Sequence, residues 1–155
     1  TGALPVRMVL HKTSKFSLDE ENGFKEAFKE IAVLELINLM NTSFRLTKVG
    51  NYPPKRGTLC EVNSKSYLFT TGFIPELNTY PGPHIPTPAQ IVCSNEIDIY
   101  RASEEILGIT RMNWNTASIT GGQPVTFSLA RNIGGIIAEY GESIETLPTS
   151  FKYFM

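Results

Sequence analysis

The residues best suited to chemistry lie in one short polar stretch, Thr110 to Thr116. It holds Arg111, Asn113, Asn115 and the only tryptophan of the chain, Trp114. Guanidinium and amide groups donate hydrogen bonds, and arginine matches phosphate or carboxylate with two parallel donors. The stretch can therefore present donors to an anion. On these residues alone, an ordinary connection anchored by Trp114 is the commoner interpretation.

A basic strip between Arg45 and Lys65 is the second candidate. Its five cations face a single acid, Glu61, and are Arg45, Lys48, Lys55, Arg56 and Lys65. Such a strip can attract phosphate locally, although the net charge of −1 argues against a general nucleic-acid coat. A solvated hairpin face is the alternative and the commoner case.

Standard catalytic and cofactor motifs are missing. Neither a GxxxxGK[ST] nor a GxGxxG nucleotide fingerprint occurs. Two histidines, His11 and His84, and two lone cysteines are too few and too separate for a zinc site. No elbow motif supports a serine nucleophile, and paired carboxylates fall on helix faces predicted to be solvated. The motifs therefore predict no hydrolase centre.

Composition indicates one globular domain. The chain has 155 residues, of which 41% are hydrophobic and 19% charged, enough for a real core. It shows no bilayer-length apolar run and no secretory signal pattern. Cys60 and Cys93 lie in apolar runs without CxxC spacing, which indicates reduced, buried thiols in a cytoplasmic protein; a disulfide between them stays open.

The periodicity predicts strand, helix, strand at the start. The strands are expected at Pro5–Leu10 and Val33–Met40. Between them, Ser17 and Glu20 form an S-x-x-E capping box for a helix over Leu18–Ala32. If the two strands pair in parallel, this is a right-handed crossover unit.

The middle and end of the chain predict a hairpin or antiparallel meander, then two helices. Expected strands are Phe44–Val49, Gly57–Val62, Tyr67–Thr71 and Ala89–Cys93, with an irregular proline-rich stretch over Gly72–Pro88. Asn95 is expected to cap a helix from Glu96 to about Leu107, and Pro124 to begin the last helix. Two glycines inside that helix, Gly134 and Gly135, predict close packing against a neighbour.

Several short motifs also follow one another in a specific order. They are Val9 to Ser14, Arg56-Gly57-Thr58, Leu68 to Pro75, Tyr80-Pro81-Gly82, Met112 to Asn115, Pro124-Val125-Thr126 and the terminal Phe154-Met155. Each motif is weak alone, whereas their order and spacing together are fairly specific. Together they resemble the C-terminal half of a PIWI domain, in particular that of prokaryotic Argonautes.

The resemblance covers essentially the whole chain. It implies that residues 1–155 are the C-terminal part of a PIWI domain with an α/β, RNase H-like fold, a mixed sheet with flanking helices. It also implies a fragment whose earlier strands lie elsewhere. We therefore expect the isolated piece to expose an apolar sheet edge or face.

The resemblance bears on catalysis as well. Cleaving members of the family use acidic side chains to hold two Mg²⁺ ions across the scissile phosphate. By resemblance, two of the four acids would precede residue 1, and the other two fall at Lys12 and Arg131. A cation there would repel a metal ion. The resemblance thus implies a catalytically inactive form, such as the short prokaryotic Argonautes that work with a separate effector.

Without catalysis, the function that the resemblance still implies is the binding of guide and target strands. In this family the guide 5′-phosphate lies where the MID and PIWI domains join, often with Mg²⁺ and the terminal carboxylate of the chain. The residues that this implies are Arg111, Asn113, Asn115 and the carboxylate of Met155, with Arg56, Lys48 and Arg131 as looser candidates for backbone phosphates.

Three functions stay open on the sequence. The first is an inactive module for guide-directed recognition of invading nucleic acid, RNA or DNA. The second is an active Mg²⁺-dependent nuclease whose acids are completed outside this chain. The third is a structural domain that docks an effector protein. Cleavage of a complementary strand would favour the second, and failure of the full-length protein to retain nucleic acid would favour the third.

Overall fold

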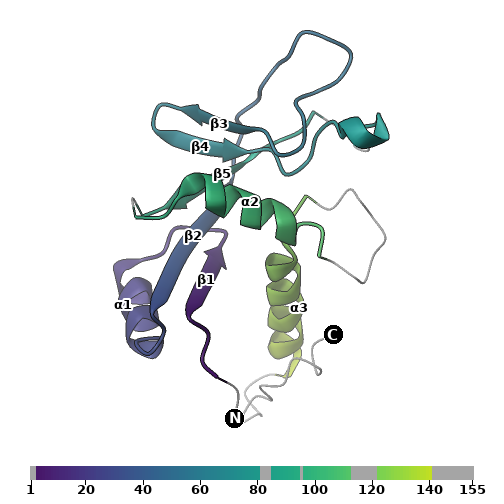
Figure 1. Cartoon of the computed structure of the whole chain (residues 1–155). Helices are drawn as coiled ribbons and strands as arrows, with labels where there is room; N and C mark the ends of the chain where they lie inside the picture. The colour runs from purple at the N-terminus through teal and green to yellow at the C-terminus, as the bar shows by residue number, and fades with distance from the viewer. Residues whose placement is uncertain (1–2, 81–84, 95, 113–121, 141–155) are drawn as a thin grey trace.

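The computed structural model describes residues 3–80, 85–94, 96–112 and 122–140, which form a mixed five-stranded sheet with flanking helices (Figure 1). The strand order is β1-β2-β5-β4-β3. Only β1 and β2 are parallel, and the other three pairings are antiparallel. The strands are β1 Arg7–Lys12, β2 Val33–Asn41, β3 Leu59–Val62, β4 Lys65–Leu68 and β5 Ala89–Cys93. The predicted α/β class is confirmed.

The first unit, β1-α1-β2, forms as local sequence predicts. Ser17 and Glu20 complete the capping box: the Ser17 hydroxyl accepts from the Glu20 N–H at 3.2 Å, and a Glu20 carboxylate oxygen accepts from the Ser17 N–H at 2.8 Å. The helix α1 spans Leu18–Ala27 and ends five residues earlier than predicted. The chain must turn there, because Ile31 is buried and the Val33 N–H donates to the Val6 carbonyl as β2 begins.

Alternation along the strands gives the sheet two different faces. One face carries the core cluster, in which side chains of β2, β4 and β5 pack against the helix α2 (Ile99–Ile109). The helix α3 (Val125–Tyr140) lies on this same side, where His11 of β1 contacts Thr126 and Phe127. The opposite face carries α1 (Figure 1). The core residues are Ile37, Leu39, Leu68, Ile91, Ala102 and Ile106.

The predicted strand over Phe44–Val49 is wrong. The chain from Thr42 to Thr58 forms a long loop. Lys55 makes an isolated bridge with Phe73 there, but residues 44–49 pair with no strand. Instead, the Phe44 ring stacks on Tyr67 of β4 with centroids 4.4 Å apart, and Val49 is 99% exposed. β3 begins at Leu59, two residues later than predicted, and β4 spans Lys65–Leu68 rather than Tyr67–Thr71. Asn63 and Ser64, both at positive φ, close the tight two-residue turn between the two strands.

Two predictions about the helices in the C-terminal half are wrong: where the first of them begins, and how the glycines of the last one pack. α2 begins at Ile99 rather than Glu96, and Asp98 caps it by accepting from the Tyr100 N–H at 2.9 Å; Asn95 lies outside the described residues. The prediction that Gly134 and Gly135 pack closely is wrong, because both are exposed and an added Cβ would meet nothing within 4 Å. α3 contacts the sheet through its first turn, at Thr126 and Phe127.

Two further expectations can be compared with the structure. The first strand is predicted over Pro5–Leu10, whereas β1 spans Arg7–Lys12; it is half-buried because it lies at the edge of the sheet. Cys60 and Cys93 are free thiols, half-buried on β3 and β5. In the part of the chain that is described, no helix combines the length and apolar character needed to cross a bilayer.

Candidate anion-binding site

Arg56 is the first component of the site, and its guanidinium is fixed in place. Its Nε donates to the Thr70 carbonyl at 2.8 Å. One terminal nitrogen donates to the Leu107 carbonyl at 3.4 Å and to the Thr110 hydroxyl. The side chain of Arg56 thereby joins the β2–β3 loop to the end of α2, while its other terminal nitrogen donates no hydrogen bond within the described residues.

Backbone contacts hold the loop that carries Arg56. The Arg56 N–H donates to the Phe73 carbonyl, and the Phe73 N–H donates to the Pro54 carbonyl, each at 3.0 Å. This close approach depends on Gly72, which has φ +147°. A Cβ at Gly72 would lie 2.4 Å from the Pro54 carbonyl oxygen, a distance that real Cβ atoms do not reach.

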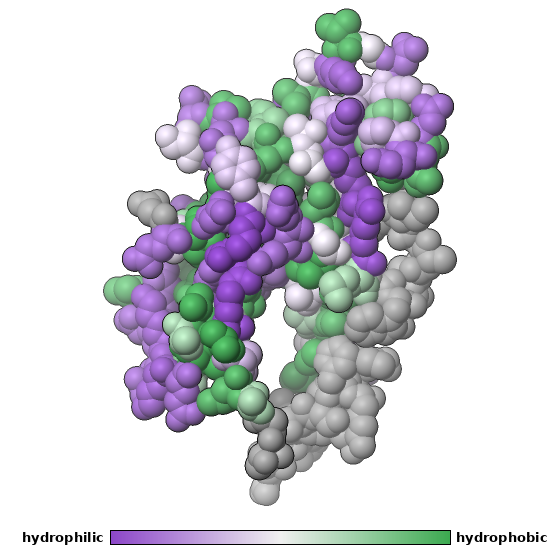
Figure 2. All heavy atoms as spheres, viewed as in Figure 1, coloured by the Kyte–Doolittle hydropathy of each residue, from purple (hydrophilic) through white to green (hydrophobic). Residues whose placement is uncertain are grey.

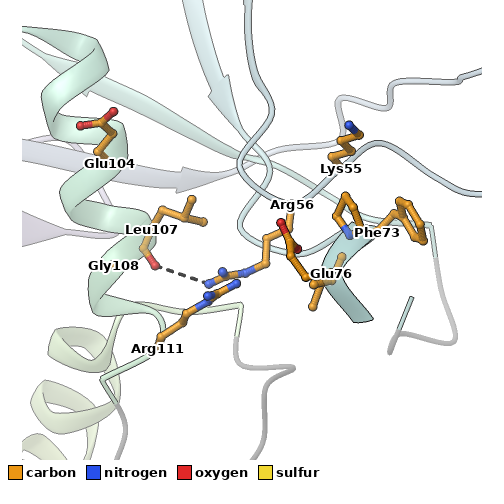
Figure 3. Close-up of a pocket in the computed structure, with 10 residues that line it drawn as sticks. Lys55, Arg56, Phe73, Glu76, Glu104, Leu107, Gly108 and Arg111 are labelled. Carbon is orange, nitrogen blue, oxygen red and sulfur yellow. Dashed lines mark hydrogen bonds between the residues drawn. The ribbon is translucent and has the colours of Figure 1, made fainter. Parts of the chain in front are cut away.

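Arg111 is the second component, placed by the end of α2. Thr110 caps this helix and its hydroxyl donates to the Leu107 carbonyl at 2.6 Å. The Arg111 side chain then extends so that its guanidinium lies beside that of Arg56 (Figure 3). Burial lowers the pKa of Arg56, and the nearby charge of Arg111 lowers it further. Two like charges therefore face one another across a small space.

The space between them is a pocket of about 480 Å³. Within the described residues, neither guanidinium forms an ion pair with a carboxylate. An anion bound there would offset the repulsion and accept hydrogen bonds from two planar donor groups. The pocket is lined by Lys55, Arg56, Phe73, Ile74, Pro75, Glu76, Glu104, Leu107, Gly108 and Arg111.

The structure thus brings together two predicted site residues, Arg56 and Arg111, that are distant in sequence. Sequence reasoning missed the contribution of Phe73, which has no local signal; Lys55 was visible only as part of the basic strip. Lys48 is exposed in the β2–β3 loop and does not line the pocket. Asn113, Asn115 and Met155 lie outside the described residues, so their proposed roles stay predictions.

Arg131 occupies a different cavity, of about 360 Å³, near the start of α3. Its guanidinium donates to the Gln123 side chain at 3.4 Å. Polar side chains of Thr13, Asn41 and Thr87 share the lining. Thr70 separates the two sites: its carbonyl accepts from Arg56, and it also lines this second cavity.

Lys12 points away from the Arg131 cavity. Its ammonium pairs with Glu20 of α1 at 2.5 Å and lies 5.5 Å from the centroid of the Phe16 ring. Because strand side chains alternate, the next residue, Thr13, faces the cavity instead. Thr13 is also the residue directly after β1. None of Lys12, Thr13 and Arg131 is a carboxylate, and the described residues contain no cluster of metal-binding side chains.

A network of charged side chains connects β1 and β2 to α2. Glu35 of β2, with its side chain only 8% exposed, pairs with Arg7 of β1 at 2.5 Å and also with Arg101 of α2. Arg7 in turn binds Glu105 of α2 at 2.7 Å. Figure 2 shows hydrophilic residues gathered over α2 on this side. These ion pairs connect α2 to both β1 and β2, so the network fastens α2 to the sheet.

Comparisons with known proteins support the fold assignment. No protein-family model matches the sequence, and no curated protein is significantly similar to it. Solved structures of Argonaute proteins do match. Aa-Ago, crystallised with externally bound siRNA, aligns over 92% of this chain with a TM-score of 0.65 and 19% identity. The Argonaute of Clostridium butyricum, bound to guide DNA and a 19-mer target DNA, aligns over 84% with a TM-score of 0.62 and 18% identity.

The described fold is therefore Argonaute-like. The chain spans 19% and 17% of the lengths of these two proteins, so it corresponds to a small part of each.

Proposed function

We propose that this chain is the C-terminal part of the PIWI domain of a catalytically inactive prokaryotic Argonaute, where it binds guide and target strands. The paired guanidiniums of Arg56 and Arg111, facing one pocket in an Argonaute-like fold, carry this proposal. A phosphodiester has the charge and the acceptor oxygens that such a pair lacks. Of the matching Argonaute structures, one was crystallised with externally bound siRNA and another was bound to a guide DNA and a target DNA.

In this proposal the module acts in the cytoplasm, in guide-directed recognition of invading nucleic acid. It works beside a MID domain and, where present, an effector protein. The carboxylate of Met155 would help to hold Mg²⁺ at the guide 5′-phosphate, and the ion would neutralise phosphate charge there. Arg56 and Arg111 would contact a phosphate directly.

Replacing Arg111 by alanine tests the binding role. We expect guide affinity to fall at least about tenfold, because a charge-assisted hydrogen bond contributes about 1.5–3 kcal/mol. The loss should depend little on base sequence, and the slope of log affinity against log salt should fall by about one unit. The melting temperature should hardly change, because the Arg111 side chain donates no hydrogen bond within the described residues.

The measurement is guide affinity across salt concentrations in the full-length protein, with thermal melting alongside. Lys29→Ala is the control, since it removes one exposed cation from the turn that follows α1. Unchanged affinity and salt slope would remove Arg111 from the site. Lower stability with normal affinity would mean that Arg111 instead caps the carbonyl end of α2.

The second expectation is that the full-length protein does not cleave a complementary strand with Mg²⁺ or Mn²⁺. Arg131 would repel a metal ion from the cavity that Thr13 lines, so neither Lys12→Asp nor Thr13→Asp alone should produce cleavage. The assay follows product strands on a gel over time. Efficient metal-dependent cutting by the unmodified protein, abolished by substitutions within this chain, would show that it is an active nuclease.

A further inference from the structure

The wall of the Arg56–Arg111 pocket continues into an aromatic stack. Phe73 lines the pocket, and the ring of Tyr52 stacks on Phe73 with centroids 4.1 Å apart and planes 17° from parallel. Phe73 covers one face of the Tyr52 ring, yet Tyr52 remains 40% exposed. An aromatic ring is thus held at the surface beside a pocket of mixed charge, in which Glu76 and Glu104 line the wall together with the two guanidiniums.

The connection between the stack and the pocket is short and stiff. Pro53 and Pro54 follow Tyr52, and each proline fixes its own φ. Pro54 is buried and its carbonyl accepts from the Phe73 N–H at 3.0 Å. Lys55 comes next, exposed and pointing away from the two guanidiniums (Figure 3). The aromatic ring and the cations therefore keep a fixed relation, as a site for a two-part ligand requires.

An aromatic ring next to fixed cations matches a nucleotide. Every base has a flat face that can stack on an aromatic side chain, and stacking of this kind does not depend on base identity. It does require an unpaired base, because a paired base within a duplex is already stacked on its neighbours. The phosphate of the same or an adjacent nucleotide would then lie at Arg56 and Arg111.

We propose that Tyr52 is the stacking platform for one unpaired base of a strand whose phosphate occupies the Arg56–Arg111 pocket. This inference rests on the proposed function and narrows it to a single-stranded nucleotide of any base. A Tyr52 that only anchors its loop to Phe73 would bind no base.

The test uses the full-length protein and 5′-phosphorylated single-stranded DNA and RNA oligonucleotides of mixed sequence. Tyr52→Leu should weaken binding about tenfold, whereas Tyr52→Phe and Tyr52→Trp, which keep a flat ring, should bind nearly as the wild type does. An abasic site is then moved along the oligonucleotide one position at a time. At one position the missing base should weaken binding to the wild type but not to Tyr52→Leu, which is the signature of a direct contact.

The outcomes separate this inference from the proposed function. If the wild type binds no oligonucleotide, the proposed function itself fails. If the wild type binds and Arg111→Ala weakens binding, but Tyr52→Leu binds normally, the stacking inference is overturned and the function stands. If Tyr52→Leu melts at a much lower temperature, its weaker binding could come from unfolding. The abasic oligonucleotides are then tested on the wild type and on Tyr52→Trp, which both keep a flat ring at this position. A profile without any sensitive position would then overturn the inference.

Discussion

Glu35→Gln is expected to lower the free energy of unfolding by about 3 kcal/mol. The Glu35 side chain is 8% exposed and accepts from both Arg7 and Arg101. Glutamine has a similar shape but no charge, so it leaves Arg101 without a carboxylate and Arg7 with Glu105 alone. Removing this carboxylate is costly because it is itself buried and because its two cationic partners, 30% and 44% exposed, lose its compensating charge.

The pH dependence of stability gives an independent check. The hydrogen bond from Arg7 holds the pKa of Glu35 below its usual range. A carboxyl with a lowered folded-state pKa stabilises the fold above its unfolded pKa, about 4.3, and loses that contribution as pH falls through the folded value. The wild type should therefore lose more stability than Glu35→Gln as the pH falls below about 4.3.

Urea unfolding of both proteins between neutral and acidic pH measures these differences. Glu26→Gln is a matched control, because Glu26 also pairs with a cation, Lys29 at 2.7 Å, but is 75% exposed. Its loss should cost at most about 0.5 kcal/mol. Equal effects of the two substitutions would show that the Glu35 network does not fasten α2 to the sheet.

Gly72→Ala is expected to destabilise the protein by about 3 kcal/mol and also to weaken guide binding. The backbone of Gly72 has φ +147°, a conformation that is strained for any residue with a side chain. The added Cβ would also meet the Pro54 carbonyl oxygen at 2.4 Å and the Arg56 nitrogen at 2.8 Å. The Arg56 loop must then move away, and the two guanidiniums would no longer face the same pocket.

Gly50→Ala is the control that separates the effect of backbone strain at a positive φ from the effect of moving the Arg56 loop. Gly50 also has a positive φ, +131°, but a Cβ there would meet nothing within 4 Å. We expect Gly50→Ala to cost about 1 kcal/mol and to leave guide affinity unchanged. Thermal melting and guide affinity, measured on both variants, test the comparison. Normal affinity of a folded Gly72→Ala protein would show that the position of Arg56 does not matter for binding.

Local sequence signals determined much of the fold. The capping box at Ser17 and Glu20 fixed the start of α1, and apolar runs predicted β2 and the limits of β5. Pro124 placed the start of α3. These signals succeed because capping, periodicity and proline geometry act over a few residues. The sequence also singled out Arg56 and Arg111 as basic candidate site residues, but it did not predict that their side chains lie side by side.

Tertiary structure decided the rest. Phe44–Val49 has a strand-like composition but no partner strand, so it forms a loop. Alternation turned Lys12 towards α1 and Thr13 towards the Arg131 cavity, a choice that depends on which face of β1 packs against α1. Above all, Arg56 meets Arg111 because Gly72 permits close approach of its loop and the end of α2 lies opposite. Contacts between residues far apart in sequence have no local pattern, so only the folded chain could place these two charges together.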